Sequence, residues 1–347
     1  MKTINIDDNH EYLFENNKPL LAFSPDNDYQ SWKKQIKDKY IELLGLNEIA
    51  KNECELNIEI EEIKEFDSYI RIRYTFTSEK ECIVPCYLLI PKNRKIEKLP
   101  VCIVLQGHSS GFHISIGEQK YDEDNRWLDT QATGLYAIEN GFAALCIEQR
   151  GMGERTTPLD NRGRALTCGC YFTAMTALLL GRTIIGERVW DVHKGIDTLS
   201  YFEKQYQLDL DDITLIGNSG GGTATYYSAC FDSRIKMAVS SCAICTYKDS
   251  IAYRSHCSCN YIPQIAKYMD MGELASLIAP RKLLILNGQI DPIFLLKGTQ
   301  EVYKVIKTIY QKENAENNVR LVVYKNKPHY FDKDAAFTNI KEMREQK

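Results

Sequence analysis

The sequence predicts an α/β fold with a mostly parallel central sheet, an antiparallel N-terminal edge and helices on both faces. After residue 100 the strand-like runs are uniformly apolar and alternate with helix-like segments, which is typical of parallel strands buried on both sides. Residues 69–76 and 82–90 instead alternate in polarity, and this period of two indicates half-exposed antiparallel strands. A length of 347 residues fits one large domain with appendages.

The first 60 residues are polar and are expected to form an N-terminal helical arm, while residues 61–347 form the main domain. Residues 33–44 carry apolar side chains at helical spacing, and Gly45 follows as a terminator. This helix is expected to pack on the main domain; the alternative is a contact within a homo-oligomer. Two insertions, near 152–185 and 245–280, are expected on the loop side of the sheet, where insertions shape a pocket.

A nucleophile motif lies at residues 217–221, which match the pattern G-x-S-x-G around Ser219. The apolar run 213–216 precedes it and the helix-permissive run 223–230 follows, so the serine is expected on a sharp strand-to-helix turn. Only small neighbours fit beside a residue with such a strained backbone. The turn would hold the Ser219 hydroxyl clear of the sheet and aim the first helical N–H groups at the group that it attacks.

An acid and a histidine follow the serine in the order that a Ser-Asp-His triad requires on this kind of fold. Asp291 comes just after the strand-like run 282–287, and an Asx-Pro turn there is expected to set the direction of its side chain. His329 follows the strand-like run 319–324 and is the only histidine after Asp291. His329 would take the proton of Ser219, and Asp291 would hold the imidazole in the right tautomer.

Two backbone N–H groups are expected to stabilise the oxyanion that forms when the serine attacks. One belongs to Gly220, directly after the nucleophile. The other comes from the loop after the strand-like run 101–105, where His108 is the expected donor through its backbone. The His108 ring would then line the pocket; the alternative is that His108, rather than His329, is the catalytic histidine.

These features together resemble the α/β-hydrolase superfamily, and specifically its bacterial branch of acetyl xylan esterases and dienelactone-hydrolase-like proteins. The G-x-S-x-G turn and the order Ser, Asp, His are general to the superfamily, whereas the segments 148–155, 188–191 and 278–284 resemble the branch. Dienelactone hydrolases use a cysteine nucleophile, so Ser219 favours an esterase. The resemblance implies a serine carboxylic ester hydrolase that removes small acyl groups, above all acetyl, from a carbohydrate or another small molecule.

Two alternatives to the esterase stay open. A serine peptidase or amidase could use the same fold, although paired glutamates that would hold a peptide amino terminus are not visible. A non-catalytic binding protein on this scaffold would typically have lost one of the three triad residues. Neither the motifs nor the resemblance implies a metal or an organic cofactor.

Three further side chains are weighed as substrate-binding residues. Arg150, which follows the strand-like run 142–147, could clamp a substrate carboxylate, but we favour a structural ion pair at the strand end. His256 and Tyr261 belong to the second insertion, whose rings would suit stacking on a sugar. Ordinary loop packing is the alternative for each of these rings.

Composition limits the partners that the protein can bind and the cellular compartment in which it is expected. A net charge of −4 gives no basic surface for nucleic acid, and no apolar run reaches membrane-spanning length. With no apolar signal core near Met1, the chain is expected to be cytoplasmic. Its twelve cysteines are then expected to act as small buried hydrophobes. The alternative is a structural zinc site, suggested by the close pairs Cys168/Cys170, Cys242/Cys245 and Cys257/Cys259.

Overall fold

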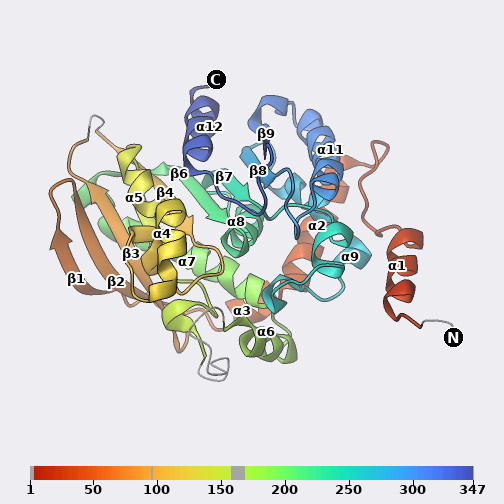
Figure 1. Ribbon diagram of the computed structural model, residues 1–347, viewed down its shortest axis with the longest axis horizontal. Helices are drawn as coiled ribbons and strands as arrows, with labels where there is room; N and C mark the ends of the chain where they lie inside the picture. Colours follow the sequence, from red (N-terminus) through yellow and green to blue (C-terminus); the bar gives the residue numbers. More distant parts are fainter. Residues whose placement is uncertain (1–3, 95–96, 158–168, 347) are drawn as a thin grey trace.

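The computed structural model describes residues 4–94, 97–157 and 169–346, and a nine-stranded sheet forms the centre of this part of the chain (Figure 1). The strands are β1 (Glu59–Glu65), β2 (Tyr69–Glu79), β3 (Cys82–Pro91), β4 (Leu99–Leu105), β5 (Ala143–Ile147), β6 (Leu208–Asn218), β7 (Ile235–Ser241), β8 (Lys282–Gly288) and β9 (Val319–Tyr324). Their order across the sheet is β1-β2-β3-β5-β4-β6-β7-β8-β9. The pairs among β1, β2, β3 and β5 are antiparallel, and all others are parallel. The predicted sheet is therefore confirmed.

Helices cover both faces of this sheet (Figure 1). Those of the described residues are α1 (Asp7–Asn16), α2 (Tyr29–Leu44), α3 (Leu46–Ala50), α4 (Asn125–Gln131), α5 (Thr133–Glu139), α6 (Cys170–Leu179), α7 (Ile184–Tyr206), α8 (Gly220–Phe231), α9 (Ile265–Tyr268), α10 (Met271–Leu274), α11 (Leu296–Lys312) and α12 (Lys333–Glu345). None of them is both long and apolar enough to cross a bilayer.

Strand β4 shows why the central strands are apolar throughout. Val101, Ile103 and Leu105 pack in one core cluster with α2, α7 and α8. Cys102 and Val104, which point to the opposite face, pack in a second cluster with α5 and α12. Because successive side chains alternate between two covered faces, neither set of positions tolerates a polar residue.

Helix α2 packs into the core, as its apolar spacing predicts. Its buried residues all belong to the larger core cluster: Trp32, Ile36, Tyr40 and Leu44. The Tyr40 hydroxyl also donates a hydrogen bond of 2.6 Å to the backbone carbonyl of Tyr227 on α8. Gly45 ends the helix at a φ of +72°, and a Cβ there would lie 2.5 Å from the carbonyl oxygen of Gly181. Both the left-handed backbone and the close approach require glycine.

The two segments expected to be insertions, near 152–185 and 245–280, contact each other. Helix α6 of the first insertion packs against the short 3-10 helix η6 (Ser258–Asn260) of the second. Cys170 and Cys259 belong to a small apolar cluster at this contact. Residues 158–168 of the first insertion, and Cys168 with them, lie outside the described residues.

A buried ion-pair network joins the loop after β5 to β2 and α7. Three cations meet three carboxylates in it: Arg150, Arg155 and Arg182 with Glu79, Glu187 and Asp191. Arg150 donates to both carboxylate oxygens of Asp191 over 2.9 Å and lies 2.7 Å from Glu79. Burial alone would raise the pKa of Asp191, but the charges of Arg150 and Arg155 hold it well below its usual range. The ion pair that we favour for Arg150 is thus present.

Replacing the fully buried Ile36 by alanine is expected to lower the free energy of unfolding by about 2–5 kcal/mol, because the substitution removes core packing and leaves a cavity. Lys34→Ala, on the exposed side of the same helix, should change it by less than about 0.5 kcal/mol. Denaturant unfolding followed by circular dichroism measures both. Equal, small effects of the two changes would show that α2 is not held in the core.

Arg150→Met is expected to cost about 3–5 kcal/mol of stability at neutral pH, because it leaves buried carboxylates without their shared cation. The lowered pKa of folded Asp191 means that its contribution is fully present above the unfolded pKa of about 3.9 and is lost as the pH falls below that value through the folded pKa. The deficit of the variant should therefore shrink over this acidic range. Urea unfolding across the same pH interval, with the exposed Arg254→Met as control, measures it. A deficit that does not change with pH would exclude an ion-pair origin.

Candidate active site

Ser219 lies on a sharp turn between a strand and a helix. Strand β6 ends at Asn218 and α8 begins at Gly220, with Ser219 between them at a φ of +54° and a ψ of −119°. Residues with a Cβ rarely adopt a positive φ, so the turn is strained. A Cβ at Gly217 would lie 2.3 Å from the carbonyl oxygen of Gly221. The turn that the G-x-S-x-G pattern predicts is therefore present, and its glycines are required by close backbone contacts.

Asp291 and His329 form a hydrogen-bonded pair. Oδ1 of Asp291 accepts hydrogen bonds of 2.9 Å from the backbone N–H groups of Ile293 and Phe294, which is the turn expected there. Oδ2 lies 2.8 Å from Nδ1 of His329. Burial alone would raise the pKa of Asp291, but His329 and the two backbone N–H groups lower it below its usual value. The ionised Asp291 therefore favours the Nδ1–H tautomer of His329, which leaves Nε2 as an acceptor.

The predicted nucleophile, acid and base follow the carboxyl ends of three parallel strands, β6, β8 and β9. Strand β7 lies between β6 and β8. The carbonyl oxygen of its last residue, Ser241, accepts a hydrogen bond of 2.8 Å from the Ser219 N–H. The next residue, Cys242, has its sulfur within 4.8 Å of the polar atoms of Asp291 and His329. Burial and the charge of Asp291 raise the pKa of Cys242 to about 12, so this thiol stays protonated and does not compete as a nucleophile.

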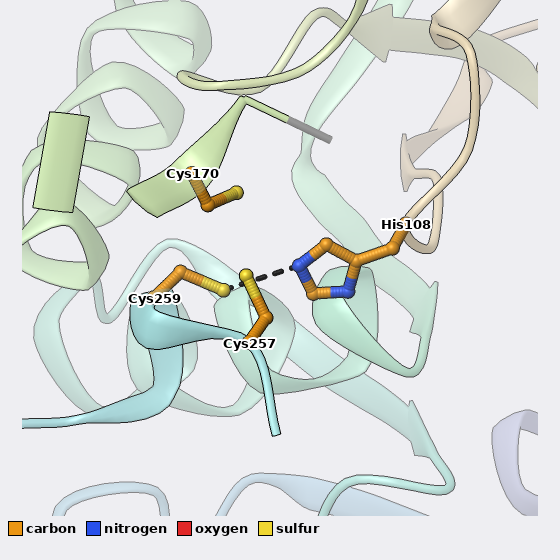
Figure 2. Close-up of side chains that lie close together, drawn as sticks. All are labelled: His108, Cys170, Cys257 and Cys259. Carbon is orange, nitrogen blue, oxygen red and sulfur yellow. Dashed lines mark hydrogen bonds between the residues drawn. The ribbon is translucent and has the colours of Figure 1, made fainter. Parts of the chain in front are cut away.

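The loop after β4 lies directly beside the Ser219 turn. A Cβ at Gly107 would be 3.6 Å from that of Ser219, and a Cβ at Gly220 would be 2.5 Å from Cε1 of His108. The two residues expected to stabilise the oxyanion, His108 and Gly220, are therefore adjacent. Nε2 of His108 lies 3.2 Å from Sγ of Cys259 and points into a group of cysteines (Figure 2). Of the two histidines weighed as the base, His329 is the one that contacts Asp291.

A buried carboxyl group that the sequence analysis did not single out supports this loop. Gln106, two residues before His108, donates a hydrogen bond of 2.6 Å to Oε1 of Glu148. Oε2 of Glu148 accepts from the backbone N–H of Phe112 at 3.3 Å. Burial raises the pKa of Glu148 to about 8. Glu148 thus connects the loop after β4 to the end of β5. In the sequence, the feature that could have identified Glu148 was its position as a polar residue directly after a buried strand.

The three residues weighed as substrate-binding lie in different surroundings. The structure places His256 near the Asp291–His329 pair. The rings of His256 and Phe294 pack edge to face with their centroids 4.8 Å apart, and the rings of Phe294 and His329 stack with their centroids 6.1 Å apart. Arg150 belongs to the ion-pair network, where its guanidinium donates to both carboxylate oxygens of Asp191. Phe294 is the neighbour of His329 that the sequence analysis missed, since nothing in the local pattern distinguishes it from a core residue.

Tyr261 lines a separate cavity of about 320 Å³, between α1 and the second insertion. Its hydroxyl donates to the carbonyl oxygen of Ile251 over 3.0 Å. Among the described residues that line this cavity are Phe14 and Tyr253, but none of the predicted triad. The structure therefore does not bring Tyr261 together with Ser219, Asp291 and His329 in this cavity.

Comparison with known proteins agrees with this architecture. The candidate hydrolase YtaP of Bacillus subtilis (strain 168) is 30% identical over 241 residues, which is 69% of this chain and 75% of that protein. A solved structure described as a candidate acetyl xylan esterase, from Bacteroides fragilis NCTC 9343, has a TM-score of 0.77 at 15% identity and covers 99% of this chain and 96% of its own. A glucuronoyl esterase from Solibacter usitatus has a TM-score of 0.61 at 14% identity, with 94% and 96% coverage.

At 15% and 14% sequence identity, the similarities to these two solved structures support the fold. The sequence profile of the Abhydrolase family matches residues 9–342, which is nearly the whole chain. The resemblance inferred from the motifs is thus confirmed, and the chain belongs to the Abhydrolase family.

Proposed function

We propose that this protein is a serine carboxylic ester hydrolase in which Ser219 is the nucleophile, His329 the base and Asp291 the residue that orients the base. The observation that carries the proposal is a serine on a strained strand-to-helix turn at the same sheet edge as a half-buried histidine, which is held by a buried aspartate through a hydrogen bond of 2.8 Å. A serine hydroxyl is a weak nucleophile at neutral pH, so it needs a base that is itself held in one tautomer.

In the proposed reaction the Ser219 oxygen attacks the ester carbonyl while Nε2 of His329 takes the hydroxyl proton. The backbone N–H groups of Gly220 and His108 stabilise the oxyanion, each contributing about 10²–10³ in rate by analogy with measured oxyanion sites. His329 then gives its proton to the leaving alcohol, and an acyl-serine remains. A water molecule, activated by His329, releases the acid and restores Ser219.

The substrate that we propose is an ester of a small acyl group, acetyl above all, on a carbohydrate or another small molecule. Solved structures of the same fold include a candidate acetyl xylan esterase, whose name denotes an acetyl ester of a carbohydrate, and a glucuronoyl esterase, whose name denotes an ester of a sugar acid. The first of these supports a small acyl group, and both support a carbohydrate ester. The half-buried ring of His256, which packs on the edge of the buried Phe294 ring beside His329, supports this proposal, because such rings suit the apolar faces of sugars.

Ser219→Ala and His329→Ala are each expected to lower the turnover of an ester by about three to six orders of magnitude, because they remove the nucleophile or its base. Asp291→Asn should cost less, and the double change Ser219→Ala/His329→Ala should be hardly worse than either single one. Turnover of p-nitrophenyl acetate measures all four.

The matched control is His193→Ala. His193 lies on α7 and pairs with Asp232, with 2.7 Å between Nδ1 and Oδ2. It is therefore also a histidine held by an aspartate through Nδ1, although Arg234 contacts this second pair as well. Its turnover should stay near that of the wild type, and circular dichroism should show that all variants fold. Near wild-type turnover for Ser219→Ala would exclude the whole mechanism.

The rate constant kcat/KM is expected to fall steeply from acetate through butyrate to octanoate esters of p-nitrophenol. Loop-side insertions that close the acyl pocket would make longer chains displace packed atoms, which costs about 1–3 kcal/mol, or roughly 10- to 200-fold in rate. The common p-nitrophenol leaving group keeps the chemistry constant along the series. Dipeptide amides should react far more slowly than acetate esters. A profile that rises toward octanoate would contradict the small-acyl assignment.

A further inference from the structure

Three cysteines and a histidine from three separate segments meet beside the Ser219 turn (Figure 2). His108 comes from the loop after β4, Cys170 from the first residue of α6, and Cys257 and Cys259 from the second insertion around η6. The three sulfur atoms and a ring nitrogen of His108 all lie within 4.8 Å of one another. Figure 2 shows the four side chains pointing toward one another, with Nε2 of His108 aimed at Cys259.

The four atoms have the composition and spacing of a zinc site. Zn²⁺ prefers sulfur and imidazole ligands, and three cysteines with one histidine form one of its common structural ligand sets. A tetrahedron with Zn–S bonds of about 2.3 Å places sulfur atoms about 3.8 Å apart. Because the atoms already lie within 4.8 Å, ligation requires shifts of about 1 Å or less. A single disulfide, by contrast, would use two of the thiols and leave the third beside the imidazole.

The surroundings also suit a bound metal. Cys170 and Cys259 are almost completely buried, so they would form a site screened from water. Three thiolates, a neutral imidazole and Zn²⁺ carry one net negative charge. Nη2 of the buried Arg188 lies 3.1 Å from Sγ of Cys170, so a cation already donates to one of the sulfur atoms. Such hydrogen bonds from outside the ligand set orient metal ligands and offset their charge.

We propose that His108, Cys170, Cys257 and Cys259 bind one Zn²⁺ ion, which holds the two insertions to the loop after β4. The expectation that the cysteines are merely small hydrophobes is revised for these three. All four ligands come from the protein, so the site is structural and keeps no open position for substrate. Where Ser219 acts as proposed above, the metal would also fix the loop that supplies the oxyanion donor, because the His108 ring packs on Gly220.

The test begins with the metal content of the full-length chain, purified without a histidine tag in a reducing buffer. Elemental analysis should give about one zinc per chain, or the reduced chain should take up one equivalent when Zn²⁺ is added. The Co²⁺-substituted protein should show the intense visible bands of tetrahedral cobalt and a thiolate-to-cobalt charge-transfer band. A chelator strong enough to remove the ion should lower the melting temperature, since the metal binds the folded state.

Single substitutions assign the ligands. Cys170→Ala and Cys259→Ala should each lose the metal, whereas Cys54→Ala, which changes a half-buried cysteine outside the cluster, should keep it. If a ligand variant fails to fold, the cobalt spectrum of the unmodified chain still decides. Because none of these measurements needs a substrate, they test the zinc site independently of the esterase proposal.

Three outcomes would overturn the zinc site. The first is a reduced chain that contains no zinc and takes up none. The second is metal that persists in both Cys170→Ala and Cys259→Ala. The third is a disulfide within the cluster, shown when alkylation of a chain purified without reductant and then denatured leaves two of Cys170, Cys257 and Cys259 unlabelled.

Discussion

The close approach of helix α8 to the centre of the sheet is the constraint on which the rest of the site depends. A Cβ at Gly221 would lie 2.1 Å from the carbonyl oxygen of Leu105, the last residue of β4. Only glycine permits that distance, and the residue two positions before it, Ser219, has a positive φ. The same approach sets the loop after β4 beside the first turn of α8, so that His108 contacts Gly220. The strained serine, the start of α8 and the loop after β4 thus share one tightly packed place in the fold.

Buried polar groups hold the loops around this contact. Glu148 at the end of β5 anchors the loop after β4 through Gln106. Arg150, two residues later, anchors the same segment to α7 through Asp191. A buried charge is costly unless it is paired, and a buried polar group is costly unless it is hydrogen-bonded, so these groups stabilise one arrangement of the loops and penalise alternatives in which a partner is lost. The sheet fixes where the strands end, and these polar contacts fix the paths of the loops that follow β4 and β5.

The sequence was informative wherever a local pattern reflects a local constraint. The apolar and alternating runs predicted the sheet, the G-x-S-x-G pattern predicted the strained turn, and Asp291 and His329 could be expected together because adjacent parallel strands end at one edge. Contacts between distant loops leave no such periodic signal. The close cysteine pairs therefore suggested zinc only as an alternative, because nothing in the sequence joined Cys170 to Cys259, and the cavity that Tyr261 lines with Phe14 could not be foreseen. The partners of Arg150 were likewise set by segments far away in the chain.

The position of β9 has a consequence for how the protein matures. Within the described part of the chain, this strand is the last of the sheet and pairs only with β8, and His329 comes after it. Most of the sheet is encoded before residue 319, as are most residues of the two core clusters. During synthesis from the amino terminus, an almost complete domain can thus emerge before the residue that would activate Ser219 has been added. A nascent chain in which these residues act as proposed would acquire its reactivity only after β9 and His329 have been added, when most strands of the sheet have already been made.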